Sequence, residues 1–191
     1  MRIATLPNVA LTALLLTLAP DHASAQDLLP LIGGPGGTPF SQVCPPHFVL
    51  TGIRARRGVT LDGIGIRCRQ VRADGTLGAE LDEGPVWGGP GGAAFAQSCS
   101  SNYVIAEQVA LYVGTLTDLT YHCFRWNPAT RRWNVNDRGT DIEVLRSIAS
   151  NGKSLGAGTF TDCPAATRPA DGVRGRSGLV VDAVGIRCNT P

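Results

Sequence analysis

Three short segments place an aspartate four residues after a glycine, and each could present a carboxylate beside accessible backbone. The segments are Gly58–Asp62, Gly114–Asp118 and Gly178–Asp182. An ionised carboxylate accepts hydrogen bonds, backbone N–H groups donate them, and a glycine lets the backbone come close to a ligand. Such a turn can bind a polar ligand, although its aspartate can equally cap the turn through its own backbone.

Each segment belongs to a longer repeat. A Gly-rich run, a Phe and a Cys precede the segment, and a second Cys closes it. Self-similarity at this spacing predicts an array of three alike units. The units span about residues 30–71, 85–126 and 153–188.

Six cysteines, two in each unit, could form disulfides or hold a metal. Sequence alone leaves many pairings open, but pairing inside each unit preserves the symmetry of the repeat. The predicted bridges are Cys44–Cys68, Cys99–Cys123 and Cys163–Cys188. Zinc is the weaker alternative, because no C-x-x-C pair is present and the repeats add only His47 and His122. We therefore predict no metal and no cofactor.

Strands dominate the pattern within the units. Phe48–Arg54 and Leu61–Arg67 are apolar and β-branched runs with partial alternation, separated by a turn at Arg57–Gly58, which predicts an antiparallel hairpin. The 13 prolines and 24 glycines lie mostly between such runs and argue against long helices. Only Asp141–Ala149 has a helical pattern. The sequence thus predicts an all-β fold.

The start of the repeat region can complete its last unit. Pro30–Gly37 lines up with Pro85–Gly92, so the segment before each Gly-rich loop is part of the repeat. Because three residues follow Cys188, the last unit lacks the strand that Val86–Trp87 supplies after the first, and Leu31–Ile32 can fill that place. As the counterpart of Ile32, Trp87 is expected in the core. Closure of the array would protect strand edges that otherwise pair with other chains.

The first 25 residues have the pattern of an export signal. They comprise a basic start at Arg2, an apolar run over Val9–Leu18 and the small residues Ala23–Ala25. The apolar run is too short to span a bilayer, which takes about 20 residues. We expect a signal peptide over residues 1–25, a single domain over residues 26–191, no membrane span, and a secreted or periplasmic location.

Charge and motifs argue against two classes of function. The formal net charge of +2 and the single lysine do not suggest a nucleic-acid binder, which would carry a stripe of Lys and Arg. No His-Glu-x-x-His helix or phosphate loop is present. We therefore predict no nucleic-acid partner, no catalytic residues and no enzyme activity.

The run Gly36–Phe40 and the motif Asp62–Ile66 resemble the jacalin-related lectins. The paired cysteines resemble the vitelline membrane outer layer proteins, which share the same fold. The resemblance covers residues 30–188. It implies a β-prism of three pseudo-equivalent four-stranded antiparallel sheets, here closed by the N-terminal strand. It also implies a secreted lectin-like module whose partner is a carbohydrate or glycoconjugate.

In jacalin-related lectins the sugar is held by the aspartate, by the amides of the two residues after the loop glycine, and by an amide of a Gly-Gly loop. Carried over, the resemblance implies two sites. The first comprises Gly37, Gly178, Leu179, Val180 and Asp182, and the second comprises Gly92, Gly58, Val59, Thr60 and Asp62.

A third combination sets Asp118 against Gly156–Gly158, where the glycine pair is broken. The alternative for the whole chain is a disulfide-stabilised extracellular structural or interaction protein without sugar binding. In that case the aspartates are turn caps. The number of working sites, the sugar and the presence of a homo-oligomer stay open.

Overall fold

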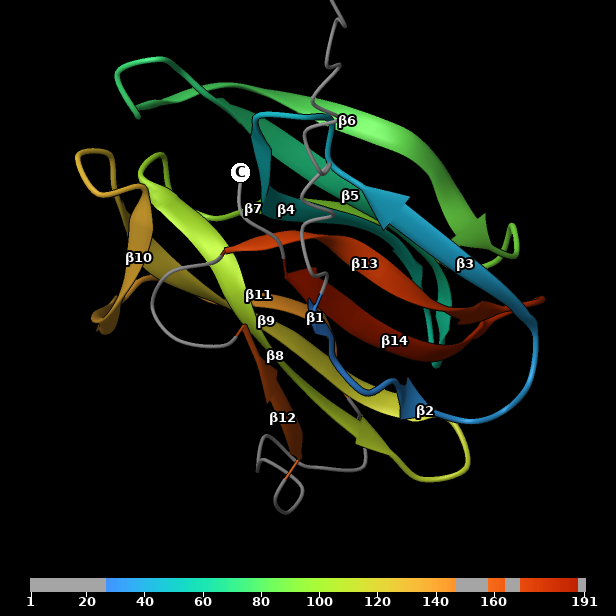
Figure 1. Cartoon of the computed structure of the whole chain (residues 1–191). Coiled ribbons are helices and arrows are strands. Elements are labelled where there is room, and N and C mark those ends of the chain that lie inside the picture. The colour runs from blue at the N-terminus through green and yellow to red at the C-terminus, as the bar shows by residue number, and fades with distance from the viewer. Residues whose placement is uncertain (1–26, 147–157, 164–168, 189–191) are drawn as a thin grey trace, which may run out of the picture.

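The computed structural model describes residues 27–146, 158–163 and 169–188, and the expected signal peptide lies outside them. The described residues form three antiparallel sheets, which Figure 1 shows side by side around a common interior. The predicted all-β prism is confirmed. In the described part of the chain, no helix is long and apolar enough to cross a membrane.

The three sheets are four-stranded in outline. The first sheet has the order β1-β14-β13-β3, with β2 also on β14, and comprises β1 (Asp27–Leu28), β2 (Ile32–Gly33), β3 (Thr38–Val43), β13 (Ala170–Ser177) and β14 (Val181–Cys188). The second has the order β6-β5-β4-β7 and comprises β4 (Phe48–Arg57), β5 (Leu61–Val71), β6 (Leu77–Gly88) and β7 (Ala93–Ser98). The third has the order β10-β9-β8-β12, with β11 also on β9, and comprises β8 (Tyr103–Tyr112), β9 (Leu116–Asn127), β10 (Arg132–Arg138), β11 (Ile142–Leu145) and β12 (Thr159–Asp162). One edge strand of the first and third sheets is thus divided in two.

Each sheet takes an edge strand from the next repeat. Hairpin β4–β5 pairs with β7, hairpin β8–β9 pairs with β12, and hairpin β13–β14 pairs with β3 from the start of the repeat region. On the other edge, Ile32 of β2 pairs with Val184 of β14, as Trp87 of β6 pairs with Ile64 of β5. The predicted closure by the N-terminal strand is therefore confirmed.

Large apolar side chains from all three sheets meet in one core. Ile66 of β5, Leu119 of β9 and Ile186 of β14 are fully buried in it. Full burial of a side chain of this size stabilises the fold by about 1.5–3 kcal/mol. A second cluster includes Phe124 and Trp133, whose ring centroids are 4.6 Å apart. The sheets therefore depend on one another for their stability.

Three disulfides join neighbouring sheets into a ring. Cys44–Cys68 joins the first sheet to the second, and Cys99–Cys123 joins the second to the third. Cys163–Cys188 joins the third sheet back to the first. The predicted pairing within units is confirmed. Each bridge nevertheless connects two sheets, because the opening strand of every unit belongs to the sheet of the preceding unit.

The predicted helix over Asp141–Ala149 is wrong where the structure describes it. Ile142–Leu145 forms β11, which pairs antiparallel with β9 and buries Ile142, Val144 and Leu145. Pairing with β9 provides the backbone hydrogen bonds that a helix would have made internally. The last residues of the predicted helix lie outside the described ranges.

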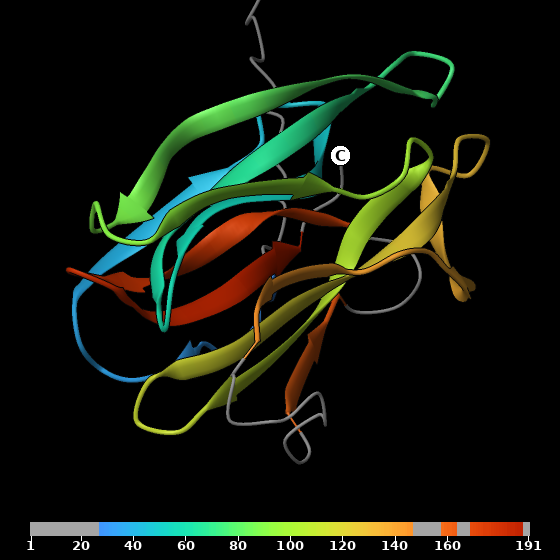
Figure 2. The same cartoon turned by 180° about the vertical axis from the view of Figure 1, so that it is seen from behind.

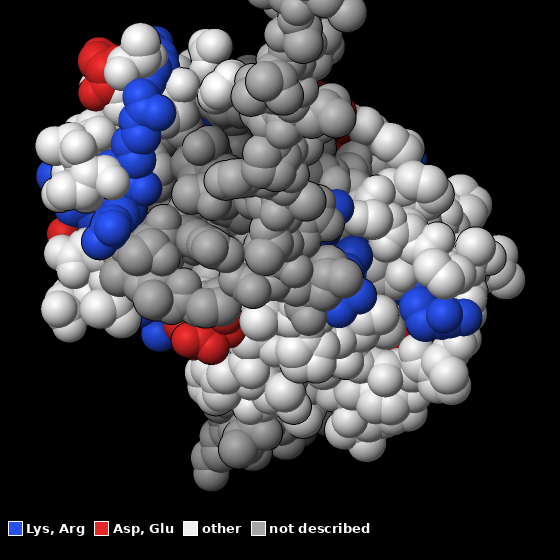
Figure 3. Space-filling model, viewed as in Figure 1, with Lys and Arg blue, Asp and Glu red and all other residues white. Residues whose placement is uncertain are grey.

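The two ends of the prism differ. The turns of hairpins β4–β5, β8–β9 and β13–β14 form the hairpin-tip end (residues 58–60, 113–115 and 178–180), on the right in Figure 1 and on the left in Figure 2. The turns between β5 and β6 and between β9 and β10 lie at the opposite end. A strip of Arg side chains covers part of that opposite end, at the upper left of Figure 3.

Removal of one bridge should weaken the fold without abolishing it. The Cys44→Ala/Cys68→Ala variant is expected to lose about 3 kcal/mol of unfolding free energy, because the unfolded chain is no longer restrained across a separation of 24 residues. Denaturant unfolding of both proteins checks this value. The fully reduced parent, which lacks all three bridges, should lose more. An unchanged unfolding free energy would contradict the stabilising role of the ring.

Candidate functional site

A Gly-rich loop crosses the tip of hairpin β13–β14. The loop joins β2, which pairs with β14, to β3, which pairs with β13. Gly33 lies opposite Ala183 at one end of the loop, and Thr38 lies opposite Ser177 at the other. The intervening residues, Gly34–Gly37, must therefore pass over the hairpin from one edge to the other.

The loop between β6 and β7 crosses hairpin β4–β5 in the same way. Gly88 pairs with Gly63 on β5, and Ala93 pairs with Arg57 on β4. The Gly89 N–H donates to Asp62 O at 2.8 Å, matching the 2.9 Å bond from Gly34 N–H to Asp182 O in the first crossing. The two crossings are therefore equivalent.

The first crossing places the Asp182 carboxylate against the glycines of the loop. A Cβ added at Gly36 would lie 2.5 Å from Asp182 Oδ1, and one added at Gly37 would overlap Asp182 Oδ2 and the Ser177 backbone. Gly37 also has a φ of 66°, in the left-handed region that favours glycine. The close approach of loop and carboxylate therefore requires glycine at position 37.

Asp62 stands in the same relation to the second loop. Added Cβ atoms would lie 3.0 Å from Asp62 Oδ1 at Gly91 and 2.5 Å from Asp62 Oδ2 at Gly92. One difference is that the Thr60 hydroxyl donates to Asp62 Oδ1 at 3.3 Å, whereas the first site has Val180 in this place. The Asp182 carboxylate thus keeps more of its acceptor capacity than Asp62 does.

Three backbone N–H groups of the first site have no backbone acceptor. Within the described loops, the turn bond runs from Gly178 N–H to Val180 O at 2.9 Å, and no backbone bond has Gly37, Leu179 or Val180 as its donor. The equivalent turn bond in the second site measures 3.0 Å. Both turns therefore offer amides beside an aspartate.

An arginine fixes the first loop from its other side. Arg176 donates from Nε to Gly36 O and from Nη2 to Gly37 O, both at 2.8 Å. Arg56 takes this role in the second site more weakly, with Nη1 3.4 Å from Pro90 O. Because the guanidinium groups hold the loop carbonyls, the amide edge of each loop is held in place without a ligand.

The glycines that begin the two turns have no steric reason to be glycine. A Cβ at Gly178 would meet only Gly37 Cα at 3.8 Å, and one at Gly58 would meet Asp62 Oδ2 at 3.6 Å and Gly92 Cα at 3.9 Å. These are ordinary contacts, and neither glycine has a φ in the left-handed region. A methyl group would therefore fit at either position, beside the Gly-rich loop at Gly178 and beside both the loop and the Asp62 carboxylate at Gly58.

The third Gly-x-x-x-Asp segment is not equivalent to the other two. Its turn bond runs from Val113 N–H to Thr115 O at 2.9 Å, one residue earlier than the glycine alignment requires. The strand register accordingly sets Thr117, and not Asp118, at the position of Asp62. The expected alignment of Asp118 with the other aspartates is wrong.

The number of residues between each aspartate and the closing cysteine of its unit indicates this shift. Asp62 and Asp182 each lie six residues before the closing cysteine of their unit, whereas Asp118 lies five residues before Cys123. The loop expected to face Asp118 lies largely outside the described residues. The structure thus assembles two loop sites and leaves the third motif without a carboxylate at the required position.

Exposed apolar side chains accompany both sites. Val59 is 89% exposed and Leu179 is 83% exposed. Trp87, expected in the core, is 37% exposed and stacks on Phe40 with ring centroids 5.7 Å apart. Its counterpart Ile32, at the equivalent edge of the first sheet, is 7% exposed.

Solved structures similar to this chain include lectins. A lectin from Malaysian banana is similar with a TM-score of 0.52 and 18% identity, over 88% of this chain and 99% of that one. A mannose-specific jacalin-related lectin from Morus nigra, solved in complex with mannose, gives 0.54 and 16% over 91% and 99%. The chain has the β-prism fold of the jacalin-related lectins.

A mannose-binding lectin from champedak has the same fold, with a TM-score of 0.56 and 13% identity over 86% of this chain and 96% of that one. No family model matches the sequence. A search of curated proteins found no match either. At these identities the likeness establishes the fold, and the ligand has to be argued from the site.

Alanine substitutions at two glycines should distinguish the cost of the loop contact from the cost of backbone strain. Gly37→Ala is expected to cost about 1–3 kcal/mol of unfolding free energy, because the new Cβ meets Asp182 and the Ser177 backbone at a left-handed φ. Gly114→Ala should cost less, since Gly114 has a φ of 75° but no atom within 4 Å of an added Cβ. Denaturant unfolding of both variants checks the order. Equal losses would show that the loop moves freely away from Asp182.

Proposed function

We propose that this chain is a secreted carbohydrate-binding protein with two sugar sites at its hairpin-tip end. The first site consists of Asp182, Gly178, Leu179, Val180 and Gly37, and the second consists of Asp62, Gly58, Val59, Thr60 and Gly92. The observation that carries the proposal is that both hairpin turns combine an aspartate, backbone amides without a backbone acceptor and a glycine that no contact requires, each beside a Gly-rich loop.

The chemistry of these groups suits adjacent hydroxyls. Each hydroxyl of a sugar can donate and accept a hydrogen bond, so a carboxylate can accept from two of them while amides donate to their oxygens. The shared fold supports this choice, because similar structures include a lectin bound to mannose. A simple mannose-type sugar is therefore the first ligand to test.

Apolar contacts complete the proposed sites. The exposed side chains of Val59 and Leu179 belong to the same turns as the amides. In the proposed complex these side chains cover the C–H face of the sugar.

A loop site of this kind binds weakly. A few hydrogen bonds made in competition with water give a millimolar to high-micromolar Kd, or about 4–6 kcal/mol. Two sites on one chain would raise the effective affinity for a branched or clustered glycan without any new contact. A homo-oligomer would have the same effect.

Export is part of the proposal. The signal-like pattern of residues 1–25 supports it, as do three disulfides, which persist in oxidising compartments. A secreted or periplasmic location would also expose the sites to extracellular glycans.

Substitution of the two aspartates tests the proposal directly. In the Asp182→Asn/Asp62→Asn variant an amide replaces each acceptor-only carboxylate with little change of shape, so binding should be lost while the thermal midpoint stays within a few degrees of the parent. A glycan array on the protein lacking residues 1–25 selects the ligand, and titration calorimetry with methyl α-mannoside and the best array ligand measures binding. Unchanged binding by this variant would refute the site assignment.

The turn glycines provide a second test. Gly178→Ala and Gly58→Ala fit the folded protein but add a methyl group beside the Gly-rich loop of each proposed site, so both should weaken binding and leave unfolding almost unchanged. If the aspartate variants instead lower the thermal midpoint strongly and the array stays silent, the aspartates are turn caps. The chain is then better described as a disulfide-stabilised structural or interaction protein.

A further inference from the structure

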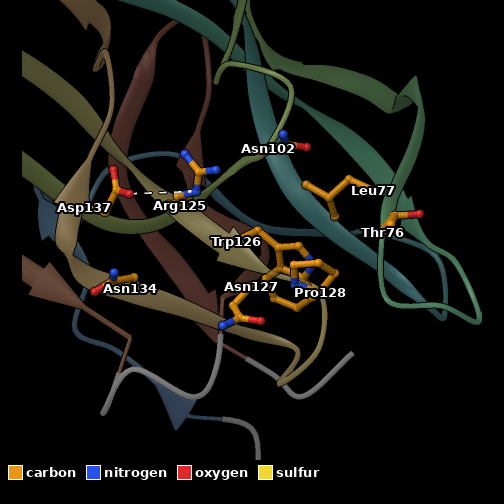
Figure 4. A pocket seen from close by; sticks show the side chains of 9 residues that line it. All are labelled: Thr76, Leu77, Asn102, Arg125, Trp126, Asn127, Pro128, Asn134 and Asp137. Atoms are coloured by element: carbon orange, nitrogen blue, oxygen red, sulfur yellow. Dashed lines mark ion pairs between the residues drawn. The ribbon is translucent and has the colours of Figure 1, made fainter.

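A cavity of about 580 Å³ lies at the end of the prism opposite the hairpin tips. The turn between β5 and β6, the loop before β8 and the hairpin β9–β10 form its walls. Its volume falls within the range of small-molecule sites, about 300–1,000 Å³. Figure 4 shows the lining side chains converging on it from these segments.

Side-chain hydrogen bonds join the two turns that border the cavity. The buried Trp126 indole donates from Nε1 to Gly75 O at 2.8 Å, and Arg131 donates from Nη2 to Ala73 O at 3.0 Å. Gly75 has a φ of 82° and packs so closely against the Pro128 backbone that no Cβ fits between them. The cavity is therefore preformed.

Leu77 and Pro128 supply apolar surface at one side of the cavity, and the buried Trp126 supports them from the core. Trp126 and Pro128 lie next to each other, and Leu77 lies nearby in Figure 4. Trp126 is 3% exposed and belongs to the smaller core cluster, so the core fixes this surface. A ligand with a flat apolar face could rest on it.

Polar side chains with spare hydrogen-bonding capacity face this surface. The Tyr103 hydroxyl donates to Asp137 Oδ1 at 2.9 Å, and Arg125 Nε lies 3.8 Å from Asp137 Oδ2. Asn134 accepts a backbone N–H through Oδ1 at 3.0 Å, which leaves its NH₂ group. Among the hydrogen bonds of the described residues, the Asn102 side chain makes none. The wall thus combines a carboxylate, a guanidinium group and two amides.

We propose that this cavity is a further carbohydrate site, separate from the loop sites, that takes a neutral mono- or disaccharide. Arg125 and Asp137 offset each other's charge, so the cavity does not select a charged ligand. Its free groups both donate and accept, as sugar hydroxyls require. The apolar side matches the C–H face of a pyranose ring. The cavity shares no residue with the loop sites, so a test of one proposal does not decide the other.

Side-chain resonances report on the cavity directly. The uniformly ¹⁵N-labelled protein is titrated with mannobiose, maltose, cellobiose, lactose and N,N′-diacetylchitobiose to about 20 mM, above the millimolar Kd that such a site is expected to have. At least one disaccharide should shift the Trp126 indole N–H and the Asn102 and Asn134 amide signals together. The Asp182→Asn/Asp62→Asn variant should show the same shifts with an unchanged Kd.

Removal of free polar groups should abolish the response. Arg125→Met/Asn102→Ala is expected to weaken binding at least about tenfold, because two side-chain donors are lost. Arg132→Met, an exposed change on the same hairpin outside the cavity, should bind as the parent does. Thermal unfolding confirms that each variant is folded.

Four outcomes would overturn the proposal. The first is the absence of any shift at the cavity signals with all five disaccharides. The second is a response that persists in the Arg125→Met/Asn102→Ala protein. The third is a response to the zwitterion alanine and to no disaccharide, which would make the cavity an amino-acid site. Loss of the response in the Asp182→Asn/Asp62→Asn protein would also count against it, since the shifts would then arise from the loop sites.

Discussion

The two strands joined by each Gly-rich loop pair with opposite edges of the same hairpin, and the candidate loop sites depend on this constraint. Because β2 lies on β14 and β3 lies on β13, the connection between them has to cross the hairpin tip. The crossing brings Gly37 against a carboxylate that is more than 140 residues away along the chain. Hydrogen-bond register thus builds the site, and no helix or metal is needed to position it.

Strand exchange and the disulfides reinforce this arrangement. Every unit gives its opening strand to the neighbouring sheet, so a bridge within a unit becomes a bridge between sheets. The bridges and the shared core stabilise the sheets together. Turns at the hairpin tips can therefore be exposed, and can carry apolar residues such as Leu179, without a large effect on the fold.

The three units differ from one another in one way at the hairpin tips and in another way at the opposite end of the molecule. Two of three hairpin tips keep the aspartate, and the third has Thr117 in its place. At the opposite end, the turn after β5 and the turn after β9 lock against each other and enclose a cavity between the second and third sheets. Repetition accounts for the fold, while the differences between units decide where the candidate sites lie.

Repeat spacing alone was enough to predict the three sheets, the bridges and the closure by the N-terminal strand, because equivalent residues in a repeat occupy equivalent places in its array. The resemblance to the jacalin-related lectins, and not the repeat, predicted that Asp182 faces Gly37. The tertiary structure decided the rest. Pairing with β9 made a strand of Ile142–Leu145, since the partner strand supplied the backbone hydrogen bonds that a helical pattern would have formed locally. Strand register decided which residue of the third turn faces the loop. The cavity beside Trp126 joins residues from three separate segments, and no sequence period relates them, so only the packed structure could show it.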